Sequence, residues 1–154
     1  MNKFIPTLIL FFVAIGLIGF YFYKQEPKKE NVESVNSIIN IGSEDVLSIE
    51  VAGFKIEKTG NDYKLGNEKL NKDKVLVYID KILNLSYSKQ IEVNDEKDYS
   101  LDNPVFEIKI NDKRLYFGSE TPVSNRVYVG FEGNYYLVDK SSFEDLKIDE
   151  NSFK

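Results

Sequence analysis

The chain contains no cysteine and no histidine, and these two absences exclude most of the familiar catalytic and metal-binding chemistry. Without cysteine the protein has no disulfide bonds, no thiolate metal ligands and no thiol nucleophile. Without histidine it lacks the commonest general base, the Ser-His and Cys-His catalytic systems, and the usual ligands of zinc and copper. Carboxylate pairs, a Ser-Lys pair, or a magnesium or calcium site are the chemistry that remains. Together with the apolar run and the motifs described below, these absences lead us to predict a non-enzymatic protein that carries no cofactor.

Clusters of positive charge are also lacking. Beyond residue 23 the chain has 19 lysines and arginines, which is the total of 20 less Lys3, against 25 aspartates and glutamates, so its formal charge is −6. An acidic surface without a basic patch repels a phosphate backbone. The composition therefore predicts a protein that does not bind nucleic acid.

One long apolar run is present, at residues 4–23, and it reads FIPTLILFFVAIGLIGFYFY. A helix of this length spans roughly the 30 Å hydrocarbon core of a bilayer. A cleaved signal peptide has a shorter apolar region that ends in small residues, a lipoprotein signal needs a cysteine, and a buried helix of a soluble protein is usually shorter. The aromatic end of the run suits the membrane–water interface. We therefore predict a tail at residues 1–3, a transmembrane anchor at 4–23, a linker at 24–43 and a folded domain at 44–154.

The charges that flank the anchor leave its orientation open. Lys3 precedes the run, whereas Lys24, Lys28 and Lys29 follow it, and this small excess favours a cytoplasmic location for the C-terminal side. The very short N-terminal tail is typical of signal anchors, which export the chain that follows them.

Short strands are predicted at the start of the domain. Residues 46–51 are rich in β-branched side chains, and residues 54–58 alternate between apolar and charged, as in a strand with one face in water. Turns at Ala52-Gly53 and at residues 60–62 separate these strands from a third at 63–65. The pattern predicts an antiparallel meander.

A helix is predicted between Asn71, which can cap its first free N–H groups, and residues 84–85. Its apolar residues recur on one face: Val75, Ile79, Ile82 and Leu83. The second half repeats this order, with strands predicted at 88–93, 105–110, 114–117, 127–131 and 135–138. Gly118 is expected to end one of these strands. A short helix at 141–146 follows, with Ser141 and Glu144 at the spacing of a capping box.

The two halves therefore share an order of elements, although their residue identity is too low to establish a repeat. The predicted fold class is α+β. An antiparallel sheet dominates it, with one main helix and a short C-terminal helix packed on one face of the sheet.

Several short motifs follow one another in an order that is typical of one family. After an anchor with an aromatic end and an opening strand at residues 45–51, residues 99–104 (Tyr-Ser-Leu-Asp-Asn-Pro) match a Y-G-L-x-x-P turn, with Ser100 where glycine is usual. Residues 117–122 then match a glycine-containing segment that ends in T-P, residues 127–129 read V-Y-V, and residues 136–139 match Y-x-V-D.

Over roughly residues 44–146 this order resembles the DUF4340 family of bacterial envelope proteins, a domain of unknown function. The resemblance implies an extracytoplasmic domain on a single anchor in the bacterial cell membrane. It also implies an association with ABC-type export or gliding-related envelope systems, and it implies no catalytic residue.

An interaction surface is predicted in the second half of the domain, where aromatic residues and the only two arginines gather. Alternation along strands directs part of these rings outward, where they suit contact with protein or glycan. The same rings are also ordinary cross-strand pairs, and this alternative stays open. The predicted surface consists of Tyr116, Tyr128, Phe131, Tyr135, Tyr136, Arg114 and Arg126.

Two other clusters have simpler interpretations. Residues 94–98 carry several oxygen ligands, but an EF-hand calcium loop needs glycine at its sixth position, where this chain has Tyr99. A solvated loop explains them. Lys140 and Ser141 suggest Ser-Lys chemistry, but a capping role for Ser141 explains the same residues.

The sequence therefore predicts a membrane-anchored, extracytoplasmic accessory domain that contacts another envelope protein. The alternative is a carboxylate-based enzyme or a binding module that acts on envelope glycan, and such an enzyme needs a cleft with two carboxyl groups about 5–9.5 Å apart. Residues 44–146 are expected to fold without the anchor.

Overall fold

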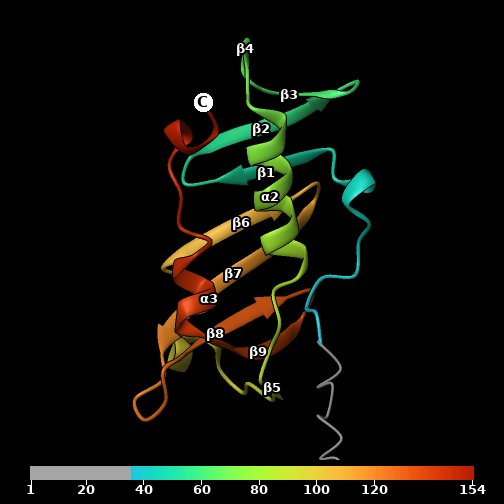
Figure 1. Cartoon of the computed structure of the whole chain (residues 1–154). Helices are drawn as coiled ribbons and strands as arrows, with labels where there is room; N and C mark the ends of the chain where they lie inside the picture. Colours follow the sequence, from blue (N-terminus) through green and yellow to red (C-terminus); the bar gives the residue numbers. More distant parts are fainter. Residues whose placement is uncertain (1–35) are drawn as a thin grey trace, which may run out of the picture. The chain divides into compact units, whose positions relative to one another are not determined.

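Nine antiparallel strands form a single sheet in the computed structural model, which describes residues 36–154. The strands follow the order β4-β3-β2-β1-β6-β7-β8-β9-β5 (Figure 1). The predicted antiparallel, α+β architecture is confirmed. The predicted tail, the anchor and residues 24–35 of the linker lie outside the described residues, and no helix within residues 36–154 is long and apolar enough to cross a membrane.

Two meanders and one added strand make up this sheet. The first meander consists of β1 (Ser48–Val51), β2 (Phe54–Thr59), β3 (Asp62–Leu65) and β4 (Glu68–Lys69). The second consists of β6 (Phe106–Ile110), β7 (Lys113–Glu120), β8 (Arg126–Phe131) and β9 (Asn134–Asp139), and β5 (Lys89–Ile91) pairs with β9. The helices are α2 (Lys72–Leu83) and α3 (Lys140–Glu144), and short 3₁₀ turns form η1 (Ser43–Asp45), η2 (Glu96–Tyr99) and η3 (Glu150–Phe153).

The first hairpins of the two meanders, β1–β2 and β6–β7, have the same register, which the sequence alone could not establish. Ile49 pairs with Ile56 in the first hairpin, and Ile108 pairs with Leu115 in the second, each 59 positions later. Both hairpins turn through two residues, β1 and β6 pair with each other at the centre, and each meander leads into a helix. The two hairpins are therefore equivalent about a local, approximate two-fold axis between β1 and β6. The next strand pairs differ, because Ile56 pairs with Leu65 whereas Leu115 pairs with Phe131 across a longer loop.

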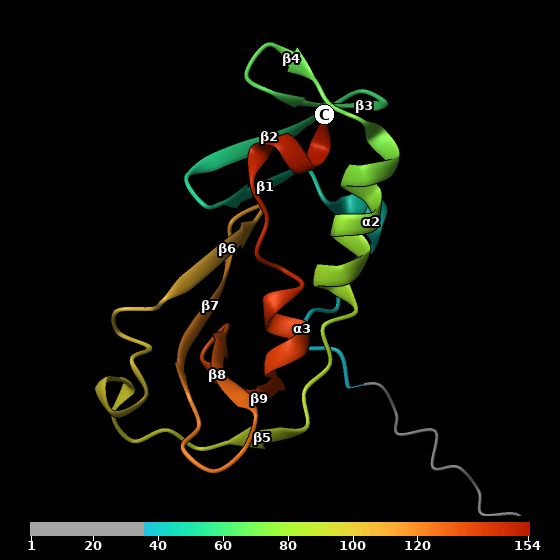
Figure 2. The same cartoon turned by 60° about the vertical axis from the view of Figure 1, so that its left-hand side comes forward.

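Helix α2 begins and ends where the sequence predicts. The side-chain oxygen of Asn71 accepts hydrogen bonds from the backbone N–H groups of Asp73 and Lys74, at 3.1 and 3.3 Å, and Asn84 follows the last turn. These bonds satisfy donors that have no partner inside the helix. Figure 2 shows α2 and α3 on the same side of the sheet, as predicted.

Helix α3 begins differently from the prediction. Its N-cap is Asp139, and the predicted capping box of Ser141 and Glu144 is wrong. The Glu144 carboxylate instead accepts from the Lys147 ammonium at 2.8 Å. The helix starts one residue earlier because β9 continues to Asp139 and leads straight into it.

The core lies between the sheet and the helices and extends beyond the predicted start of the domain. Ile38 and Ile39, which the sequence analysis placed in the linker, are buried with the strands, and Ser37 bridges to Ser86. At the other end, the Phe153 ring packs edge-on against Tyr78 with their centroids 5.5 Å apart. Residues 36–43 and 150–153 therefore belong to the folded unit.

Candidate functional site

The seven residues of the predicted interaction surface divide between the two faces of the sheet. Phe131 and Tyr136 are buried in the core beneath the helices. The others alternate with core residues and lie on the opposite face: Tyr116, Tyr128, Tyr135, Arg114 and Arg126. Of these, Tyr116 is buried, whereas Tyr128 and Tyr135 are partly exposed. The predicted set is therefore not one continuous surface, and binding by its exposed members stays a prediction.

The opposite face of β7–β9 is covered by the chain itself. The η2 turn, olive in Figure 2, lies on the side of the sheet away from the helices. Its Glu96 carboxylate accepts hydrogen bonds from the hydroxyls of Tyr116 and Tyr135, at 3.2 and 2.7 Å. Its Tyr99 ring packs on Tyr128 with 4.5 Å between centroids. Burial, and then the charge of Glu96, raises the pKa of Tyr116 to about 12.

Two glycines in the sheet make room for this cover. A Cβ at Gly118 would lie 2.1 Å from the Tyr99 carbonyl oxygen, and a Cβ at Gly130 would lie 2.2 Å from Cζ of Tyr116. The prediction that Gly118 ends its strand is wrong, because β7 continues through it to Glu120. The sequence suggests a break there because glycine is rare in strand interiors, whereas here it permits a close approach of backbone.

The motifs that carry the family resemblance meet at this cover. Ser100 has a φ of 56°, a left-handed conformation that suits the glycine usual at its position. Leu101 is buried against Gly118, so the Y-G-L-x-x-P turn packs on the glycine of the next motif. A structural role in fixing the loop between β5 and β6 explains both motifs.

The two arginines have partners within the sheet. The Arg114 guanidinium lies 2.7 Å from the Glu107 carboxylate and 4.9 Å from the Tyr116 ring centroid, and the hydrogen bond to Glu107 raises the pKa of Arg114. Arg126 lies 3.6 Å from Asp139. Both arginine side chains are partly exposed, at 48% and 40%.

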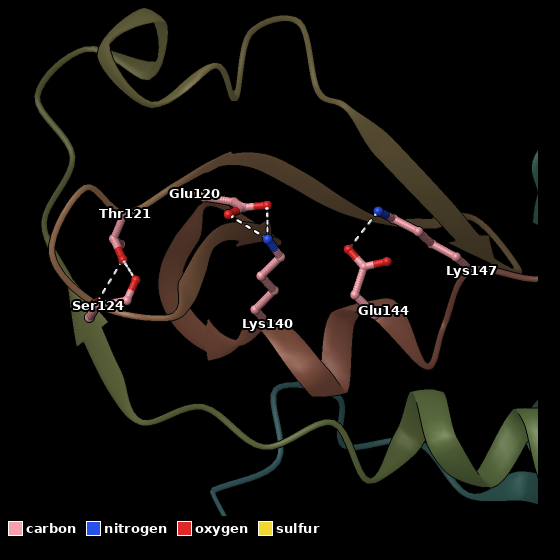
Figure 3. Close-up of polar contacts among 6 residues, drawn as sticks. All are labelled: Glu120, Thr121, Ser124, Lys140, Glu144 and Lys147. Carbon is pink, nitrogen blue, oxygen red and sulfur yellow. Dashed lines mark hydrogen bonds and ion pairs between the residues drawn. The ribbon is translucent and has the colours of Figure 1, made fainter.

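Lys140 and its neighbours do not form a Ser-Lys pair. Figure 3 shows the Lys140 ammonium on the Glu120 carboxylate, with its two contacts at 2.7 and 2.8 Å. The hydrogen bond to Glu120 raises the pKa of Lys140, the reverse of what a lysine general base needs. Nearby, the Thr121 hydroxyl bonds to the Ser124 hydroxyl at 2.6 Å and shapes the β7–β8 loop.

No group of three or more acidic, histidine or cysteine side chains within residues 36–154 is placed to hold a metal ion. The carboxylates of Glu50 and Glu107 both line one hollow, but each is engaged by a cation, Lys109 at 3.6 Å and Arg114 at 2.7 Å.

A groove beside α2 is the feature that sequence reasoning missed. It has a volume of about 380 Å³ and runs between α2 and the C-terminal segment, where Tyr78, Ile148 and Phe153 form its apolar walls. Val77 stands at its edge with 58% of its surface exposed. The Tyr78 hydroxyl is satisfied by the Leu146 carbonyl at 2.9 Å, so the groove presents little polar surface.

Two lysines of α2, Lys74 and Lys81, flank this apolar groove, together with Asp73. Lys74 bonds to the carbonyl of Lys154, whereas Lys81 makes no ion pair in the part of the chain that the structure describes. The signal in the sequence was Val77 itself, an apolar residue between lysines on the side of the helix that the apolar stripe does not use. The C-terminal segment that completes the groove gave no such signal.

Comparisons with known proteins agree with the resemblance of the motifs. No curated protein and no solved structure matches the chain. The family model described as Domain of unknown function (DUF4340) matches residues 62–154, which is more than half of the chain. The match begins at β3, so it leaves out the β1–β2 hairpin although β1 pairs with β6 at the centre of the sheet. The chain belongs to the DUF4340 family, whose function is unknown.

Proposed function

We propose that the protein is a membrane-anchored, non-enzymatic interaction domain. In this proposal residues 4–23 form a single transmembrane anchor, and the sheet domain lies outside the cytoplasm, where it binds another protein of the bacterial envelope. An association with an ABC-type export or gliding-related system is the setting that the resemblance favours. The family model brings no enzymatic activity with it, because it describes a domain of unknown function.

The apolar groove beside α2 is the observation that carries the proposal. A hollow with apolar walls and an exposed valine at its edge is the kind of surface that an amphipathic segment of a partner covers. Lys81, which has no ionic partner within the described residues, favours a partner whose apolar side chains are flanked by acidic residues. The groove is therefore the proposed contact surface.

The alternative, an enzyme or binding module for envelope glycan, has less support. The hollow lined by Glu50 and Glu107 is the place where two carboxylates could act, but both are held in ion pairs. Glycoside hydrolysis needs one of the pair as a proton donor. No specific observation favours this alternative.

Site-specific photo-crosslinking tests the proposal in the native membrane. A photoreactive residue at Val77 of the full chain should give one reproducible adduct, and V77D should weaken association with the captured protein by at least tenfold. Val123 is the matched control, because it is also an exposed valine, at 98%, but lies in the β7–β8 loop. Equal adducts from both positions, or association with the captured protein that V77D leaves unchanged, would contradict the proposed groove.

A further inference from the structure

A second hollow lies where the two meanders meet, on the sheet rather than beside α2. It has a volume of about 410 Å³, and its lining includes the Ala52-Gly53 turn on one side and residues 104–107 on the other. Strand β1 pairs only with Ile108 to Ile110 of β6, so Phe106 and Glu107 extend past its end. The hollow is the gap that this mismatch leaves in the sheet.

The equivalence of the β1–β2 and β6–β7 hairpins supplies a filled version of the same place. Adding 59 to the residue numbers converts the Ala52 turn into the Asn111 turn, and residues 45–48 into 104–107. The side-chain oxygen of Asn111 accepts from the N–H groups of Leu47 and Ser48, at 2.8 and 3.1 Å, and its amide nitrogen donates to the Asp45 carbonyl at 3.0 Å. The Asn111 backbone N–H also donates to the Ser48 carbonyl at 2.9 Å. One carboxamide therefore closes the gap on that side.

On the other side a methyl group stands in place of the carboxamide. Ala52 occupies the position equivalent to Asn111, and Glu107 the position equivalent to Ser48. Within residues 36–154 no hydrogen bond joins Ala52 or Gly53 to the backbone of Glu107. Ala52 also has a φ of 49°, which asparagine and glycine adopt more readily than alanine. The chain thus keeps a strained alanine where an asparagine would fill the hollow.

We propose that this hollow binds an extended segment of another polypeptide chain. An amide of that segment takes the place that the Asn111 carboxamide has in the filled copy: its carbonyl accepts from the Glu107 N–H, and its N–H donates to the Pro104 carbonyl, the equivalents of the Ser48 N–H and the Asp45 carbonyl. This is strand addition at an interrupted sheet, in which main-chain hydrogen bonds supply the affinity. Val105, with 65% of its surface exposed at the hollow, offers an apolar contact for a neighbouring side chain. The inference does not depend on the groove beside α2.

Two substitutions of Ala52 separate filling of the hollow from relief of strain. A52N introduces the carboxamide of the filled copy, whereas A52G relieves the positive φ and leaves the hollow open. The full chain, labelled with ¹⁵N and held in detergent micelles, is titrated with the peptide acetyl-Val-Asn-Val-amide. The wild type and A52G should show a saturable shift of the Glu107 amide resonance, and A52N should bind at least tenfold more weakly. No saturable shift in the wild type, or equal binding by A52N, would overturn the proposal.

Hydrogen exchange tests the open site without any peptide. In the wild type the Glu107 amide should exchange at least tenfold faster than the equivalent Ser48 amide, which is bonded to Asn111. In A52N the Glu107 amide should become protected, whereas in A52G it should not. Equal protection of Ser48 and Glu107 in the wild type would show that the hollow is already closed, and the inference would fail independently of the α2 groove.

Discussion

Replacing Gly130 by alanine should destabilise the domain, although the same change in an ordinary strand would stabilise it. Glycine in the middle of a strand costs roughly 0.5–1 kcal/mol relative to alanine, so propensity alone predicts a gain. In this structure a Cβ at position 130 would lie 2.2 Å from Cζ and 2.6 Å from the hydroxyl of Tyr116, far inside normal contact. Overpacking of this kind typically costs about 1–3 kcal/mol. The net expectation is a loss of up to about 2.5 kcal/mol.

A double-mutant cycle makes the sign of this effect decisive. Tyr116→Val removes the ring that meets the new Cβ, so Gly130→Ala in that background should stabilise the domain by roughly 0.5–1 kcal/mol. Urea unfolding of residues 36–154, followed by circular dichroism, measures all four proteins. A stabilising effect of Gly130→Ala in the wild type, or the same loss in both backgrounds, would refute the position of Tyr116 over β8.

Three further predictions concern the cap, the ionisation and the boundary of the domain. Asn71→Ala should lower the free energy of unfolding by about 1 kcal/mol with an unchanged urea m-value, because two helix N–H groups lose their acceptor; no change would show that water replaces the cap. The pKa of Tyr116 is raised to about 12 in the folded protein. The stability that its neutral hydroxyl contributes to the fold is therefore complete below about pH 10, the ordinary pKa of tyrosine, and is lost as the pH rises through about 12. The melting temperature should therefore fall over this window, and less in Tyr116→Phe; an equal fall would contradict the assignment. A fragment that starts at residue 36 should unfold cooperatively. A fragment that starts at residue 44 lacks the buried Ile38 and Ile39, so it should melt at a lower temperature or without a cooperative transition. Equal melting of the two fragments would place the domain boundary at residue 44.

Local signals in the sequence predicted the elements whose causes are local. The Ala52-Gly53 turn, the alternation of residues 54–58 and the Asn71 cap each depend on neighbours within a few residues, and the structure confirms all three. Strand β4 was missed because its two residues, Glu68 and Lys69, are too short for an alternating pattern.

Features that depend on distant residues were not predictable in the same way. Gly118 suggested a strand end because no neighbouring residue explains a glycine there. The structural reason for the glycine is the Tyr99 carbonyl, which approaches it from the loop between β5 and β6. The predicted surface joined Tyr135 and Tyr136, which lie on opposite faces of β9, because the sequence could not tell which face the helices cover or that Glu96 lies over the other. The groove beside α2 combines Val77 with Phe153, which only the tertiary fold brings together.

Protease accessibility in intact spheroplasts tests the central claim, that this is a domain tethered outside the cytoplasm, most directly. Protease added to intact spheroplasts should remove residues 36–154 while cytoplasmic marker proteins survive. Without protease, the protein should sediment with the membranes and resist extraction by high salt. The contradicting result is a domain that is cut only after the inner membrane is opened, or a chain that salt releases from the membrane. Either outcome would remove the setting in which the proposed interaction takes place.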